Sequence, residues 1–134
     1  MSEPTTTTEA VVFKAALFGT AGWAAENVLF GPRYSALFAG RKVPFLPVYA
    51  AGGLAVIAAA PRIQQCPLIL RAAIYAAIGT GVEYAGCQID RKTLGAKSWD
   101  YGERDGLAEA TQGCLDWKHS ALWGLLGLVA ERFA

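Results

Sequence analysis

Charge is scarce in this chain of 134 residues, because Asp, Glu, Lys and Arg make up only 17% of it while hydrophobic residues make up 54%. Soluble domains carry about 25% charged residues. The mean hydropathy is +0.30, and the few charges cluster and leave long stretches almost free of them. This pattern indicates a multi-pass integral protein of the cell membrane. The net charge is only +1, whereas nucleic-acid-binding proteins typically carry a surplus of basic residues. No nucleic-acid partner is therefore expected.

Signatures of other protein classes are also missing. The motifs GxxxxGK[ST], GxSxG and HExxH do not occur, so nothing predicts nucleotide hydrolysis, a serine hydrolase or a zinc protease. Cys66, Cys87 and Cys114 are an odd number without paired spacing. They predict neither a disulfide framework nor a metal site and are interpreted as structural, and no cofactor is expected. The start, MSEPTTTTEA, lacks the basic region of a cleavable signal, and residues 1–8 are predicted to form a disordered polar tail.

The long apolar stretches predict four membrane-spanning helices within one domain, residues 9–134. A helix needs about 20 apolar residues to cross a hydrocarbon core of about 30 Å. The predicted spans are residues 8–30, 43–60, 67–88 and 112–133. Pro44 and Pro47 stand at the start of the second, where a re-entrant segment is the alternative. The predicted fold class is all-α, a polytopic four-helix transmembrane bundle.

The loops differ in their content of lysine and arginine. With four spans, the first and third loops share one side of the membrane and hold most of these residues, namely Arg33, Arg41, Lys42, Arg91, Lys92, Lys97 and Arg104. The other side has Arg62 and Arg132. Positive charge favours the cytoplasm, so loops one and three are predicted to be cytoplasmic and both termini external.

Two carboxylates interrupt the predicted spans. Glu26 and Glu83 would each cost about 2.5–3.5 kcal/mol near a bilayer centre on insertion scales. Gly19 and Gly22 share a helical face with Glu26, and Gly79 shares one with Glu83, at spacings of three and four. Small residues let a neighbouring helix come close, so both acids are predicted to point into the bundle. The alternative is a protonated carboxyl that only ties helices together.

The last predicted span offers partners for these acids. Asp116, His119 and Trp123 lie on one helical face at spacings of three and four, and Lys118 is nearby. A bundle holding Glu26 and Glu83 beside Lys118 and His119 would satisfy its charges internally. A histidine at the membrane surface is alternatively a solvated or helix-capping group.

Four motifs in order carry a resemblance to a known family. They are GWAAEN (22–27), VPFLPVYAAGG (43–53), VEYAGCQIDRKTLGAKSWDYG (82–102) and SALWGLLG (120–127). Together they resemble the CmpB-type family of small bacterial membrane proteins, named as ABC-transporter permeases. Gly102 stands where that family often has serine after WDY, and the stretch before SALWGLLG departs from the family's usual one.

The resemblance implies a permease-like or transport-related membrane component with a polar site between helices. Its motifs implicate Trp23, Glu26, Pro44, Pro47, Tyr49, Glu83, Trp99, Asp100, Tyr101, Trp123 and Gly124. The predicted ligand-binding residues are Trp23, Glu26, Asn27, Tyr49, Glu83, Trp99, Asp100, Tyr101, His119 and Trp123. Expected partners are the lipid bilayer, further copies or other membrane subunits, and a lipid or amphiphilic ligand.

Two other functions fit the same residues. One is an intramembrane enzyme acting on a lipid or isoprenoid, with Glu26 or Glu83 as general acid–base. The other is an accessory structural subunit of a larger membrane complex. The sequence does not decide whether the chain is an enzyme.

Overall fold

The computed structural model describes residues 7–30, 37–38, 41–42, 46–93, 95 and 99–134. Its elements are α1 (Thr7–Phe30), β1 (Leu37–Phe38), β2 (Arg41–Lys42), α2 (Pro47–Ile63), α3 (Leu68–Lys92), α4 (Gly106–Ala110), α5 (Trp117–Ala130) and the 3-10 turn η1 (Glu131–Phe133). The two short strands pair antiparallel. The predicted polar tail lies outside the described residues except for its last two positions, and Arg33, Pro44 and Lys97 lie outside them entirely.

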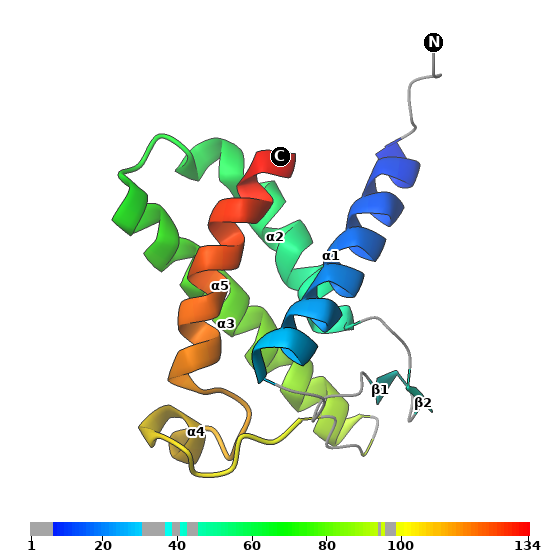
Figure 1. Ribbon diagram of the computed structural model, residues 1–134, viewed down its shortest axis with the longest axis vertical. Helices are drawn as coiled ribbons and strands as arrows, with labels where there is room; N and C mark the ends of the chain where they lie inside the picture. The colour runs from blue at the N-terminus through cyan, green and yellow to red at the C-terminus, as the bar shows by residue number, and fades with distance from the viewer. Residues whose placement is uncertain (1–6, 31–36, 39–40, 43–45, 94, 96–98) are drawn as a thin grey trace.

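The helices pack in a chain of neighbours. α1 packs on α2, α2 also packs on α3, and α3 packs along α5 (Figure 1). The start of α1 and the C-terminus lie at one end of the bundle, together with the turn between α2 and α3. α4 and the strands lie at the opposite end. The Leu46 N–H donates to the Gly19 carbonyl at 3.0 Å, which fixes the start of α2 against the middle of α1.

Small residues bring α3 and α5 into close contact. A Cβ on Gly124 would lie 2.8 Å from the Ala72 carbonyl oxygen, and a Cβ on Gly127 would lie 2.3 Å from Cβ of Tyr75. Backbones that approach this closely gain packing contacts that a larger side chain would prevent. Val56, Tyr75 and Ala130 form the buried apolar cluster beside this contact.

The C-terminus is tied to the bundle by a buried acid. Glu131 pairs with Arg71 at 3.1 Å and accepts a hydrogen bond from the Tyr75 hydroxyl at 2.5 Å. The Gln64 side chain donates to the Glu131 carbonyl at 3.0 Å. Because Arg71 and Tyr75 belong to α3, these contacts hold η1 against the α2–α3 turn.

The structure confirms that the chain is mainly helical, but it does not confirm four membrane-spanning helices. Within the described ranges, α3 is the one helix long and apolar enough to cross a membrane, and α2, with 17 residues, is apolar but shorter. α1 has 24 residues, but Lys14, Glu26 and Asn27 reduce its apolar character. α5 has 14 residues, or about 21 Å at a rise of about 1.5 Å per residue. The predicted fourth span began too early, because residues 112–116 precede this helix.

Cys87 and Cys114 form a disulfide, so the expectation that the cysteines would not pair was wrong. Cys87 lies in the last third of α3, and Cys114 lies three residues before α5. Both are buried, and Leu115, Trp99 and Leu107 pack around them. The chain has three cysteines because Cys66 is free, and this odd number gave no indication that the other two are paired. Pairing depends on how the chain folds back onto α3, which the spacing of cysteines does not reveal.

Candidate functional site

The two predicted acids are buried inside the bundle. Glu26, on α1, is 4% exposed and Glu83, on α3, is 5% exposed. This burial confirms that both carboxylates point inward. Each accepts hydrogen bonds from side chains of other segments, and those partners define the candidate site.

Glu26 belongs to a linear chain of contacts between polar and charged side chains. It accepts a hydrogen bond from the Tyr49 hydroxyl, and its Oε1 lies 2.9 Å from Nε2 of His119. The other ring nitrogen, Nδ1, lies 2.7 Å from Oδ1 of Asp116. Asp116 in turn pairs with Arg104, whose Nη1 is 2.9 Å from Oδ2. The contacts therefore run in the order Arg104, Asp116, His119, Glu26 and Tyr49.

Asp116 fixes the position of His119 at the start of α5. It is the N-cap of α5, and its Oδ1 accepts from the His119 backbone N–H at 2.8 Å as well as contacting the ring. Because both ring nitrogens face carboxylate oxygens, ionised Glu26 and Asp116 require both to donate, which makes the ring an imidazolium. Burial alone would raise the pKa of Asp116, but the hydrogen bonds from His119 and the charge of Arg104 hold that pKa below its ordinary value.

Glu83 is held by neutral donors. Its Oε2 accepts from the Tyr101 hydroxyl at 2.7 Å, and its Oε1 accepts from the Trp123 indole N–H at 3.3 Å. Tyr101 lies in the segment between α3 and α4. Burial raises the pKa of the Tyr101 phenol far above its ordinary value and the Glu83 carboxylate raises it further, so the hydroxyl stays a donor.

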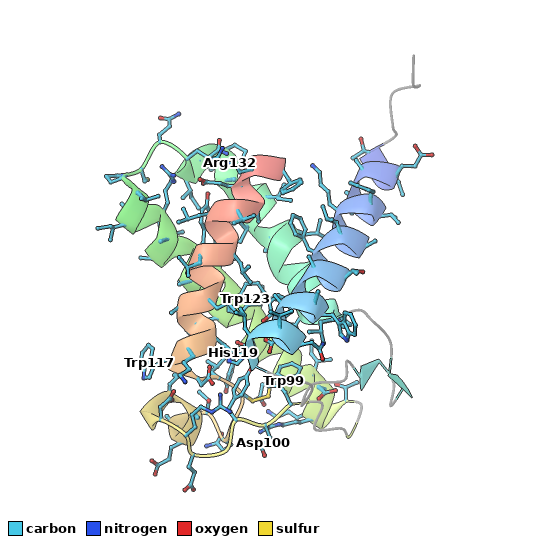
Figure 2. All side chains as sticks on the ribbon, viewed as in Figure 1. Trp99, Asp100, Trp117, His119, Trp123 and Arg132 are labelled. Atoms are coloured by element: carbon cyan, nitrogen blue, oxygen red, sulfur yellow. A yellow bond between two sulfur atoms is a disulfide. The ribbon has the colours of Figure 1, made fainter. Side chains whose placement is uncertain are left out.

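Aromatic contacts join the two acids into one structure. Tyr49 stacks on Trp123 with ring centroids 4.9 Å apart, and Tyr101 stacks on His119 at 4.5 Å. Figure 2 shows Trp123 and His119 on successive levels of α5. The closed set is called the polar ring here and consists of Glu26, Tyr49, Trp123, Glu83, Tyr101 and His119. The guanidinium of Arg104 lies 5.5 Å from the Tyr101 ring centroid, in cation–π range.

Glycines on three helices make room for the stacked pair. A Cβ on Gly22 of α1 would lie 2.2 Å from the Tyr49 ring. A Cβ on Gly52 of α2 or Gly79 of α3 would lie 2.4 Å and 2.2 Å from the Trp123 ring. The predicted small-residue faces beside Glu26 and Glu83 therefore accommodate the aromatic side chains of the ring.

The charges around the ring do not balance. Three carboxyl groups, from Glu26, Glu83 and Asp116, are met by two cationic groups, Arg104 and the His119 imidazolium. One negative charge is in excess among these contacts, and Glu83 is the acid whose hydrogen bonds come from neutral groups. Among the described residues, no group of His, Cys, Asp and Glu is arranged to hold a metal ion.

Four of the predicted site residues lie outside the ring. Trp23 and Asn27 are half-buried on α1, where the Asn27 amide donates to the Trp23 carbonyl at 2.8 Å. Trp99 packs by the disulfide and donates to the Cys114 carbonyl at 3.0 Å. Asp100 is exposed and accepts from a backbone N–H in its own turn. Figure 2 shows Trp99 and Asp100 at the end of the molecule beyond His119.

The charged partners differ from the predicted ones. Lys118 is exposed and Arg104 supplies the cation instead. Arg104 lies between α3 and α4, so no helical spacing relates it to the acids in the sequence. Asp116 did carry one, because an aspartate directly before an apolar helix is a favoured N-cap.

Comparison with known proteins gives one match. A family model described as "Putative ABC-transporter type IV", the CmpB family, matches residues 13–134. No curated protein and no solved structure matches the chain. The matched region contains every residue of the polar ring together with Arg104 and Asp116. Because the match covers almost the whole chain, the protein belongs to this ABC-transporter-related CmpB family.

Proposed function

We propose that the protein is a membrane-embedded, transport-related subunit in which Glu83 takes up and releases a proton. The observation that carries the proposal is the environment of Glu83, a carboxyl 5% exposed whose hydrogen bonds come from the neutral Tyr101 hydroxyl and Trp123 indole. Buried ionisable groups inside membrane proteins are commonly parts of proton or ion pathways.

The excess charge supports the same proposal. A site with three carboxyls and two cations reaches neutrality when one carboxyl binds a proton. Glu26 and Asp116 each face the His119 imidazolium, so a proton on either would remove a favourable ion pair. The described hydrogen bonds to Glu83 come from neutral groups, so its protonation breaks no direct ion pair among these contacts and costs less than protonation of Glu26 or Asp116.

The outer surface supports a membrane location. Large apolar side chains are exposed on the helices, among them Phe13 at 66%, Ile69 at 84% and Leu125 at 63%. They come from α1, α3 and α5 respectively. Apolar side chains exposed around a molecule are favourable against acyl chains and unfavourable against water. The family description adds an association with a transporter, in which this chain would act beside other subunits.

The test is a carboxyl titration by infrared difference spectroscopy on the purified full-length protein in lipid vesicles. We expect the wild type to show a protonated-carboxyl band that disappears between about pH 5 and pH 9, the range of buried acids. Glu83→Gln should abolish this band, and Glu103→Gln, which changes an exposed acid between α3 and α4, should leave it unchanged.

Two results would overturn the proposal. One is a wild-type protein without any such titrating band. The other is a band that survives Glu83→Gln and is lost with Glu26→Gln, which would move the proton to the histidine side of the ring. A purely structural role for Glu83 predicts a lower melting temperature in Glu83→Gln and no change in the titration.

A further inference from the structure

We propose that residues 99–116, called the cover here, form a disulfide-anchored cap on the polar ring and face the oxidising, extracytoplasmic side of the membrane. This inference deepens the proposed function and rests on its membrane location. It reverses the orientation that the count of lysines and arginines predicts for the third loop.

The cover contributes directly to the ring. Tyr101 donates to Glu83 at 2.7 Å and stacks on His119. Arg104 pairs with Asp116 at 2.9 Å, and Asp116 holds the other side of the histidine. The cover therefore contacts Glu83 directly through Tyr101 and reaches Glu26 only through His119, which Asp116 holds.

The disulfide lies among the contacts that hold the cover in place. Cys114 is bonded to Cys87 of α3, and its carbonyl accepts from the Trp99 indole at 3.0 Å. The Tyr101 N–H donates to the Gly113 carbonyl at 2.9 Å. Both cysteines are fully buried, Cys114 within the cover and Cys87 on α3. The covalent bond thus fixes the segment that carries Tyr101 to the helix that carries Glu83.

A disulfide at this place constrains the compartment. Cytosolic thiols are kept reduced, whereas disulfides form and persist outside the cytoplasm. Two thiols, Cys87 and Cys114, become one disulfide when a disulfide-carrying thiol oxidoreductase accepts two electrons and two protons and is released as a dithiol. Cys66 is free and lies in the turn between α2 and α3, at the opposite end of the bundle. One end therefore carries the oxidised pair and the other a thiol.

The cover itself carries few of the basic residues that oppose this orientation. The cover contains one basic residue, Arg104. Its acids are Asp100, Glu103, Asp105, Glu109 and Asp116. The positive-inside tendency counts lysine and arginine and hardly responds to acids, so the cover adds one basic residue to that count, while Arg91, Lys92 and Lys97 before it favour the cytoplasm. The tendency is statistical, while the sulfur–sulfur bond requires an oxidant, and we give the bond greater weight.

The experiment measures thiols on the full-length protein in cell membranes. Denatured protein is first alkylated with and without prior reduction and weighed by mass spectrometry. A membrane-impermeant maleimide is then applied to intact spheroplasts and to inverted vesicles. We expect one alkylated cysteine without reductant and three with it, and we expect Cys66 to be labelled only in inverted vesicles. Cys66→Ser is the control that must remove this label.

A second variant keeps the test decisive if lipid shields Cys66. Glu103→Cys in the Cys66→Ser background places a thiol on an exposed position of the cover, and it should be labelled in intact spheroplasts. Free Cys87 and Cys114 in membranes, or labelling of the Glu103→Cys thiol only in inverted vesicles, would overturn the proposal. Thiol accessibility does not depend on the protonation of Glu83, so this result and the infrared titration succeed or fail separately.

Discussion

Glu26 and His119 are 93 residues apart in the sequence, yet Oε1 of Glu26 lies 2.9 Å from Nε2 of His119. α1 packs chiefly on α2, so this ion pair connects the first long helix directly to the last one. Both side chains are at most 5% exposed. The pair is thus the contact through which α1 contributes an acid to a site otherwise built by later segments.

Glu26→Gln should destabilise the protein strongly. The substitution keeps the volume but removes the carboxylate that pairs with Nε2 of the buried imidazolium, and removing one partner of a buried pair costs roughly 3–5 kcal/mol. Thermal unfolding in detergent measures this. Glu103→Gln, on the exposed surface, should change stability by less than about 0.5 kcal/mol. Equal melting temperatures for Glu26→Gln and wild type would contradict the ion pair.

Tyr101→Phe should be coupled energetically to Glu83. The substitution removes the hydroxyl that donates to the Glu83 carboxylate at 2.7 Å, and hydrogen bonds to charged groups contribute about 1.5–3 kcal/mol. In a double-mutant cycle with Glu83→Gln, we expect a coupling energy of about 0.5–3 kcal/mol. Tyr84→Phe is the matched control, because Tyr84 lies next to Glu83 in sequence but is 42% exposed. Additive effects for Tyr101→Phe would argue against the contact.

Gly79→Ala and Gly81→Ala should have opposite effects. A Cβ at position 79 would lie 2.2 Å from the Trp123 ring, whereas a Cβ at position 81 meets nothing within 4 Å. Overpacking costs about 1–3 kcal/mol, while alanine at an exposed helical glycine gains up to about 1 kcal/mol. Chemical unfolding of both variants checks this, and tryptophan fluorescence should shift only in Gly79→Ala. A fluorescence spectrum unchanged in both would show that Trp123 does not occupy this space.

The burial of Glu26 and Glu83 was predictable because glycines at helical spacing mark a face where another side chain or helix packs. Trp123 was predicted from its helical spacing to Asp116 and His119 as well as from the family motifs. Tyr101 was predicted to belong to the site only through the family motifs, since nothing in a loop sequence shows that its tyrosine folds back onto a helix. The start of α5 was predictable from the N-cap signal of Asp116, but hydropathy alone placed it at residue 112. The Cys87–Cys114 pair and Arg104 depend on the path of the cover, which local patterns do not encode.

Asp116 should make stability depend on acid pH. Its pKa in the folded protein is below the ordinary value, which is about 3.9 for an unfolded aspartate. The stability it contributes is therefore complete above that value and is lost as pH falls through the folded pKa. We expect Asp116→Asn to be less stable than wild type near neutral pH, with the difference shrinking below about pH 4. Unfolding free energies measured across this range test it, and a constant difference at all pH values would refute it.

Cys87→Ser should destabilise the native protein mainly by releasing the cover. The disulfide joins residues 27 apart in sequence, and closing a loop of that length contributes roughly 3–4 kcal/mol in the chain-entropy model. Cys114→Ser should show the same loss, and the double variant should be no worse than either single one, because the two thiols act as one bond. Cys66→Ser should leave the unfolding free energy within about 0.5 kcal/mol of wild type, because Cys66 is free and partly exposed. Wild-type protein treated with a dithiol should match Cys87→Ser. If Cys87→Ser is as stable as Cys66→Ser, the contacts of Trp99, Tyr101 and Arg104 hold the cover without help from the sulfur–sulfur bond.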